Sequence, residues 1–143
     1  MTGRRAVVLT ANSDGYGVAL DLADAGVQLQ AVVDLRSNTG TSETVTAVSE
    51  LGVPILTGCT VSEMMHSHGK HHITGALISR ITGEGACEKA ARTIECDLLC
   101  MSVGYTPTSH LLHHLSARFA YNKSTAMFEV ALLPAHVIAT GSV

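Results

Sequence analysis

The chain has 143 residues, a formal net charge of −3, and 46% hydrophobic against 15% charged residues. This size fits one domain with a sizeable core, and the balance is typical of α/β proteins with buried parallel strands rather than of disordered chains. The nine basic residues are scattered, which argues against a nucleic-acid partner, and no apolar run approaches the roughly 20 residues that a membrane span needs. Without a signal-peptide pattern at the N-terminus, we expect a cytoplasmic protein.

The first part of the chain alternates strand and helix patterns. Continuous apolar runs predict buried strands, and apolar residues at helical spacing predict helices between them. Gly26 stands where a helix would end and Ser42 where the next would be capped. The predicted elements are a strand at 5–11, a polar turn at 12–15, a helix at 16–25, a strand at 29–33, a helix at 43–51 and a strand at 54–57.

From Gly58 onward the pattern changes to strands joined by turns, which predicts an antiparallel meander. A buried apolar run then predicts a last parallel strand before Pro107, and a short helix follows it. Residues 118–130 show no pattern that we could assign, and the ending is expected to be a strand running into a turn. The elements predicted here are strands at 59–65, 73–81, 86–95, 97–103 and from 135, with a helix at 109–115. The fold class is therefore α/β, a Rossmann-like parallel sheet with an inserted antiparallel β-meander.

The turn after the first strand carries part of a dinucleotide fingerprint. The spacing to the end of the predicted helix places G-x-G-x-x-G on T-A-N-S-D-G, so Thr10 and Asn12 replace two glycines and only Gly15 remains. The backbone amides of Ser13, Asp14 and Gly15 should lie at a helix N-terminus and face a pyrophosphate. The Asp14 carboxylate is an awkward neighbour for a diphosphate, because like charges repel.

Asp34 ends the second strand about 20 residues beyond the turn, where a carboxylate accepts a hydrogen bond from an adenosine ribose. It should also repel a 2′-phosphate and so favour NAD over NADP, although Arg36 leaves that preference open. The alternative is that Asp34 only caps a loop amide at the strand end. Gly104 and Tyr105, at the end of the last parallel strand, lie where the nicotinamide half is expected.

Two segments resemble known families. In CDLLCMSVGYTPTSHL, the residues Asp97, Gly104, Pro107 and Leu111 match the pattern that closes the NAD domain of glutathione-reductase-like flavoproteins with two dinucleotide folds. The segment LTANSDGYGVALDLADAGVQLQAVVDLR resembles the α subunit of heterotetrameric sarcosine oxidase, and that resemblance extends over nearly the whole chain.

The resemblance implies an NAD-binding domain at 1–104 and, at 105–143, an extension that leads back to a flavin domain. It implies noncovalent NAD in this chain, FAD in a flanking domain, and FMN at an interface with a β subunit. The implied reaction oxidises N-methylglycine, transfers one carbon to tetrahydrofolate and produces hydrogen peroxide. Other domains and subunits of a flavoprotein oxidase complex are the implied partners. We expect the chain to be cut from such a protein, to contain no catalytic residue and to be inactive alone; Ser142 departs from the flavin-contacting aspartate of the related reductases.

The cysteines and clustered histidines suggest no metal centre. The cysteines contain no CxxC pair, which excludes a zinc knuckle and a dithiol motif, and we expect them to be reduced: Cys59, Cys87, Cys96 and Cys100. Four histidines lie at a predicted hairpin tip, where no cysteine or carboxylate completes a ligand set: His66, His68, His71 and His72. We therefore predict surface histidines and no metal site.

Three functions stay open. The first is the NAD-binding domain of a sarcosine-oxidase-like flavoprotein. The second is the same domain of an opine oxidase or hydrogen cyanide synthase, whose large subunits share this layout. The third is a cofactor-free scaffold for subunit interaction, which the replacement of the glycines by Thr10 and Asn12 favours.

Overall fold

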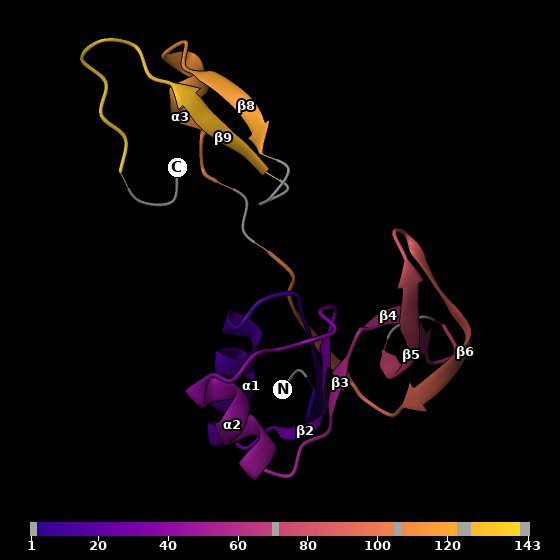
Figure 1. The fold of residues 1–143 in the computed structure, drawn as a ribbon. Coiled ribbons are helices and arrows are strands. Elements are labelled where there is room, and N and C mark those ends of the chain that lie inside the picture. Colours follow the sequence, from indigo (N-terminus) through magenta and orange to yellow (C-terminus); the bar gives the residue numbers. More distant parts are fainter. Residues whose placement is uncertain (1–2, 70–71, 105–106, 123–126, 141–143) are drawn as a thin grey trace. The chain divides into compact units, whose positions relative to one another are not determined.

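The computed structural model describes residues 3–69, 72–104, 107–122 and 127–140. The chain divides into two compact units, Met1–Gly104 and Tyr105–Val143, which are described separately (Figure 1). The first unit contains β1 (Arg5–Thr10), α1 (Asp14–Asp24), β2 (Gln28–Asp34), α2 (Glu43–Glu50), β3 (Ile55–Thr57), β4 (Cys59–His66), β5 (Ile73–Gly83), β6 (Ala86–Ile94) and β7 (Leu98–Ser102). The second contains α3 (His110–His114), β8 (Arg118–Asn122) and β9 (Met127–Leu132).

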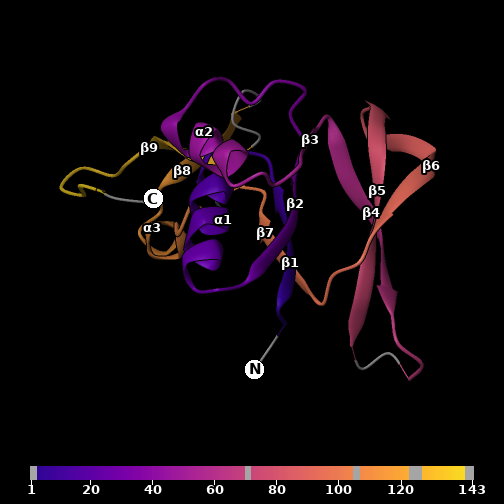
Figure 2. The ribbon, with the colours of Figure 1, turned by 90° about the horizontal axis from the view of Figure 1, so that it is seen from below.

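A four-stranded parallel sheet organises the first unit. Its order is β3-β2-β1-β7, so the chain adds strands to one side of β1 and then crosses to the other. Helices α1 and α2 cover one face of this sheet, and the antiparallel sheet β4-β5-β6 lies on the opposite side (Figures 1 and 2). The structure confirms the predicted fold class.

Two apolar cores follow from the alternation of side chains along the parallel strands. Val8 of β1 and Val32 of β2 face the helices, where they pack with buried residues of α1 and α2. Their neighbours Val7 and Val33 point to the opposite face and pack against the meander. Because both faces of the strands are covered, the strands are continuous apolar runs rather than alternating ones.

The helix boundaries follow the predicted capping chemistry. The Val45 backbone N–H donates to Ser42 Oγ at 3.3 Å, which makes Ser42 the N-cap of α2. Gly26, after the C-cap of α1, has a φ of +79°, a left-handed conformation that glycine adopts without steric cost. Helix α1 begins at Asp14, two residues earlier than predicted.

The loop before β7 is anchored to the start of β1. The Asp97 Oδ1 atom accepts hydrogen bonds from the backbone N–H groups of Arg4 and Arg5, each at 2.7 Å. The hydrogen bond from the Arg5 amide is the largest influence that lowers the pKa of Asp97 below its usual value. Asp97, part of the closing pattern found in the sequence, therefore has a local structural role in joining distant parts of the chain.

The second unit contains the predicted helix, with α3 inside the expected range 109–115, and departs from the sequence expectations after it. Residues 118–130, where we assigned no pattern, contribute to the antiparallel hairpin of β8 and β9, whose Tyr121 and Phe128 rings meet edge-on with centroids 5.3 Å apart. The strand predicted from 135 is wrong over the described residues: 135 and 136 form a turn, and 137–140 have no regular structure. A β-rich run forms a strand only where a neighbouring strand is present to pair with it, and among the described residues no strand pairs with 135–140. Residues 141–143, including Ser142, lie outside the described residues.

Candidate functional site

Four polar residues stand in register across the carboxyl edge of the parallel sheet. Thr10 of β1 pairs with Asp34 of β2 on one side and with Ser102 of β7 on the other, and Asp34 pairs with Thr57 of β3. The strand order reverses between the neighbouring strands β1 and β7. Ligands of open α/β sheets bind beyond the carboxyl ends of the strands at such a point, so this edge is the candidate site.

Gly15 allows α1 to begin directly against the end of β1. It is buried, and a Cβ atom placed there would overlap the Oγ1 and Cβ atoms of Thr10. Gly17, two residues further along the same helix, has open space where its Cβ atom would lie. The surviving fingerprint glycine is therefore required by close packing of helix on strand, whatever the turn binds.

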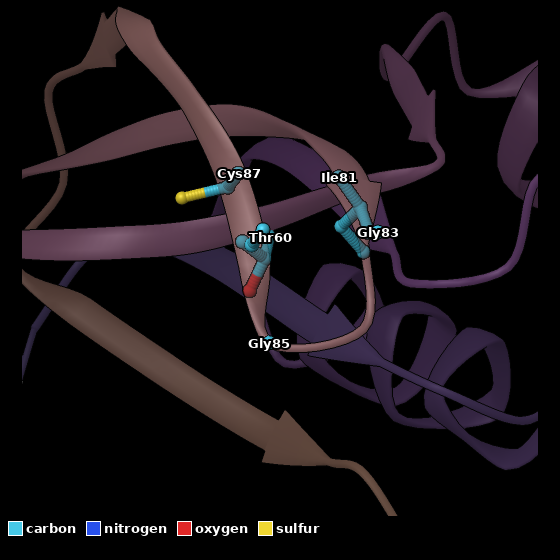
Figure 3. Close-up of a pocket in the computed structure, with 6 residues that line it drawn as sticks. Thr60, Ile81, Gly83, Gly85 and Cys87 are labelled. Atoms are coloured by element: carbon cyan, nitrogen blue, oxygen red, sulfur yellow. The ribbon is translucent and has the colours of Figure 1, made fainter.

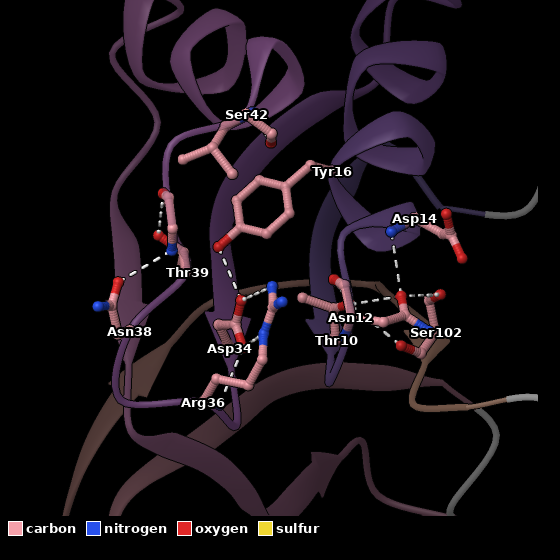
Figure 4. Close-up of polar contacts among 12 residues, drawn as sticks. Thr10, Asn12, Asp14, Tyr16, Asp34, Arg36, Asn38, Thr39, Ser42 and Ser102 are labelled. Atoms are coloured by element: carbon pink, nitrogen blue, oxygen red, sulfur yellow. Dashed lines mark hydrogen bonds and ion pairs between the residues drawn. The ribbon is translucent and has the colours of Figure 1, made fainter. Parts of the chain in front are cut away.

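The side chains of Thr10 and Asn12 form a polar network where the fingerprint would have glycines (Figure 4). Thr10 is fully buried, and its Oγ1 lies 2.8 Å from the Asn12 carbonyl oxygen and 3.0 Å from that of Ser102. The Asn12 Oδ1 accepts from the Asp14 backbone N–H at 3.1 Å and from Ser102 Oγ at 3.3 Å. One amide at the start of α1 is thus already bonded to a side chain of the turn.

The end of β2 holds a second buried polar group. Both Asp34 and Tyr16 are fully buried, and the Tyr16 hydroxyl donates to Asp34 Oδ2 at 2.9 Å (Figure 4). Arg36 binds the same carboxylate from the other side: Nη2 donates to Oδ2 at 2.8 Å, and Nε and the backbone N–H donate to Oδ1 at 3.1 and 2.9 Å. The Arg36 side chain keeps 33% of its surface exposed.

This arrangement fixes the charge state of each member. Burial raises the pKa of Asp34, but the hydrogen bonds from Arg36 and Tyr16 outweigh it and bring the pKa below its usual value. Burial, and then the hydrogen bond to Asp34, raise the pKa of the Tyr16 phenol. At neutral pH the cluster is an ionised carboxylate, a guanidinium and a neutral phenol.

The cluster leaves little for a ligand to bind on Asp34. A carboxylate offers about four lone-pair positions, and the four hydrogen bonds from Tyr16 and Arg36 use them. A ribose hydroxyl could bind Asp34 only if Arg36 or Tyr16 moved. The expected ribose contact stays a prediction.

The other predicted site residues lie at the same sheet edge or outside the described part. Ser13, the N-cap of α1, and Asp14, its first residue, are both exposed, and the Ser13 side chain makes no capping hydrogen bond. Gly104 is exposed and follows β7 by two residues. Tyr105 lies outside the described residues, so the proposed nicotinamide end is not tested.

Tyr16 and Ser102 were not predicted as site residues. Tyr16 directly follows Gly15, at the start of a helix that packs on β2. A tyrosine at this position could have been recognised in the sequence as a hydrogen-bond partner for Asp34. Ser102 gave no local signal, since it reaches Asn12 from 90 residues away.

The meander carries a shallow cavity of about 220 Å³ (Figure 3). It lies on the small antiparallel sheet and is lined by Thr60, Ile81, Gly83, Gly85, Ala86 and Cys87. Small-molecule sites are usually larger and contain several convergent polar groups. The Thr60 hydroxyl and the exposed Cys87 thiol are the polar side-chain groups here, so this cavity is a poor candidate for a dinucleotide.

The part of the chain that the structure describes, 3–69, 72–104, 107–122 and 127–140, shows neither a metal centre nor a membrane-spanning helix. Within these ranges, no three His, Cys, Asp or Glu side chains come together as metal ligands would. Lys70 and His71 of the histidine-rich hairpin fall outside that set. None of the helices that the structure describes has the length and apolar character needed to cross a bilayer.

Solved structures share this fold. T. acidophilum thioredoxin reductase is 20% identical with a TM-score of 0.62, and the match covers 81% of this chain and 36% of that one. The bacillithiol disulfide reductase of Staphylococcus aureus is 16% identical with a TM-score of 0.60, covering 84% and 35%. Putidaredoxin reductase, in its covalent complex with putidaredoxin, is 18% identical with a TM-score of 0.61, covering 87% and 31%.

These likenesses establish the fold. The chain spans about a third of the length of those three proteins. No protein-family model matches the sequence, and no curated protein matches it in sequence.

Proposed function

We propose that this chain is a dinucleotide-binding domain of a flavoprotein oxidoreductase. The observation that carries the proposal is the start of α1 at the carboxyl end of β1, beside β7, with Gly15 packed against Thr10. The amides and the dipole of a helix N-terminus favour phosphate groups at such a place. The shared fold with reductases supports the same proposal.

The residues of the β1–α1 turn fit a diphosphate. The amides of Ser13, Asp14 and Gly15 would face it, while Thr10 and Asn12 line the turn. The fit requires the Asn12 carboxamide to release the Asp14 amide, and the Asp14 carboxylate should turn away from the phosphates. When bound, NAD would supply a two-electron hydride acceptor.

The remaining contacts are assigned by position along the sheet edge. The adenosine end would lie over Asp34 and Arg36, at the end of β2. The nicotinamide end would lie near Gly104 and Tyr105, beyond β7. These assignments follow from the general location of ligands on open α/β sheets.

The finer assignment rests on the sequence resemblance. We propose NAD as the nucleotide and a sarcosine-oxidase-like enzyme as the parent, acting on N-methylglycine or a related secondary amine, with FAD held by another domain. Opine oxidases and hydrogen cyanide synthase are alternatives for the parent. Partners would be other domains and subunits of a cytoplasmic oxidase complex.

A cofactor-free scaffold is the second candidate. Two observations favour it: Asn12 already bonds an amide at the start of α1, and Asp34 is saturated by Tyr16 and Arg36. On this alternative the polar groups at the sheet edge only stabilise the fold, and the surface serves subunit interaction.

Calorimetric titration with NAD and NADH distinguishes the two candidates. Nucleotide binding predicts heat and a higher melting temperature at millimolar ligand. If NAD and NADH produce neither heat nor a higher melting temperature, the cofactor-free scaffold is the remaining candidate. The variant Asn12→Gly sharpens the result, because it frees the Asp14 amide: affinity for NAD should rise, while affinity for adenosine, which has no diphosphate, should not change.

A further inference from the structure

The charge at the end of β2 is arranged asymmetrically. The Asp34 carboxylate is fully buried, whereas the Arg36 side chain that binds it keeps a third of its surface exposed to solvent. Tyr16 closes the buried side of the carboxylate with a neutral hydroxyl. A ligand that approaches this edge from solvent therefore meets the cation of the pair before the anion.

The loop that follows β2 also carries a positive charge and no negative one. Residues 35–42 read Leu-Arg-Ser-Asn-Thr-Gly-Thr-Ser, with Arg36 as their one charged residue. Ser37 and Asn38 are exposed beside it. A guanidinium with neighbouring hydroxyl and amide groups is a donor set suited to phosphate oxygens.

We propose that Arg36, rather than Asp34, determines nucleotide specificity, so that the site accepts adenosine carrying a 2′-phosphate at least as tightly as adenosine without one. This inference rests on the proposed nucleotide function. It reverses the sequence-based expectation, in which a free Asp34 carboxylate repels a 2′-phosphate. The reversal follows because a carboxylate that is paired and turned inward presents little negative potential to a ligand.

The direct test compares three ligands on the unmodified chain by calorimetry: 5′-AMP, adenosine 2′,5′-bisphosphate and adenosine 3′,5′-bisphosphate. The 2′,5′-bisphosphate should bind at least as tightly as 5′-AMP and more tightly than its 3′,5′ isomer. The isomer carries the same added charge, so it controls for general attraction to the protein. Weaker binding of the 2′,5′-bisphosphate than of either comparison ligand would overturn the inference.

A paired substitution tests Arg36 itself. Asp34→Asn with Arg36→Gln removes both charges together and so leaves no unpaired buried ion. The ratio of the 5′-AMP to the 2′,5′-bisphosphate dissociation constant should fall about tenfold, which is the scale of one charge-assisted contact. Lys89→Gln, which removes an exposed positive charge from β6, should leave the ratio unchanged.

The outcomes separate this inference from the proposed function. Binding of 5′-AMP that exceeds binding of the 2′,5′-bisphosphate overturns the role of Arg36 and leaves nucleotide binding intact. No binding of any of the three ligands at millimolar concentration overturns both. If the double variant does not fold, the comparison of the two isomers on the unmodified chain still decides the question.

Discussion

The ends of β1 and β2 differ in how they keep the residues of a dinucleotide fingerprint. At β1 the sequence has lost two glycines and kept Gly15, which the contact with Thr10 makes sterically necessary. At β2 the sequence has kept the acidic residue, yet Asp34 is buried and fully bonded to Tyr16 and Arg36. A fingerprint residue can thus be retained because the fold needs it, so its presence alone does not demonstrate a ligand contact.

The largest expected effect is at β2. Replacing Asp34 by Ala leaves the Tyr16 hydroxyl and the Arg36 guanidinium without their acceptor, which should lower the free energy of unfolding by about 3 kcal/mol. Denaturant unfolding measures the change. Asp21→Ala, an exposed acidic residue of α1, is the matched control and should change stability by less than about 0.5 kcal/mol. Equal effects of the two substitutions would contradict a structural role for Asp34.

The same carboxylate predicts a pH dependence. The folded pKa of Asp34 is lowered, so its stabilising contribution is present above the unfolded value of about 4 and is lost as pH falls through the folded pKa. Stability measured from neutral to acid pH should fall more steeply in the unmodified chain than in Asp34→Asn. Parallel curves would show that the pair does not shift the pKa of Asp34.

The next effect is at β1. Gly15→Ala should destabilise the fold by about 2 kcal/mol, since the new methyl group forces α1 away from Thr10. Gly17→Ala, in the same helix but with open space around it, should instead stabilise by about 0.5 kcal/mol through lower backbone entropy in the unfolded chain. Thermal unfolding of both variants measures the difference. Similar shifts in melting temperature would contradict the steric conflict between a side chain at position 15 and Thr10.

A smaller loss is expected from Tyr16→Phe, which removes one of the four hydrogen bonds to Asp34 and keeps the ring. Because this hydrogen bond is made to a charged group, its loss should lower the free energy of unfolding by about 1.5 kcal/mol. Tyr121→Phe, at an exposed ring of the hairpin, should be neutral in the same denaturant titration. A neutral Tyr16→Phe would mean that Arg36 alone satisfies the carboxylate.

The smallest effect is Ser102→Ala. Its hydroxyl donates to Asn12 over 3.3 Å in a partly exposed setting, so we expect a loss of about 0.5 kcal/mol. A loss as large as that of Asp34→Ala would show that the β1 turn depends on its polar network as much as β2 does. The comparison between the two strand ends would then no longer hold.

Periodicity and turn residues predicted nearly all of the first unit. The strands, both helices and the meander follow from apolar runs, from the Ser42 cap and from the glycines after the helices. In the second unit the predicted helix at 109–115 is present as α3. The hairpin was not predicted, because a short hairpin with exposed aromatic residues such as Tyr121 and Phe128 lacks a buried face to impose a period. The structure has Thr10 and Asp34 at the carboxyl edge of the parallel sheet, where the sequence predicted them, and nucleotide binding at this edge stays a prediction.

By itself, the sequence determined the fold class and the positions of Thr10, Gly15 and Asp34 at the ends of strands, because hydrophobic periodicity is a local property of the chain. Only the tertiary structure decided what those side chains bond to. Tyr16 meets Asp34 across 18 residues, and Ser102 meets Asn12 across 90. A buried polar group takes whatever partner the packed elements bring within hydrogen-bond distance, and that partner is not encoded next to it.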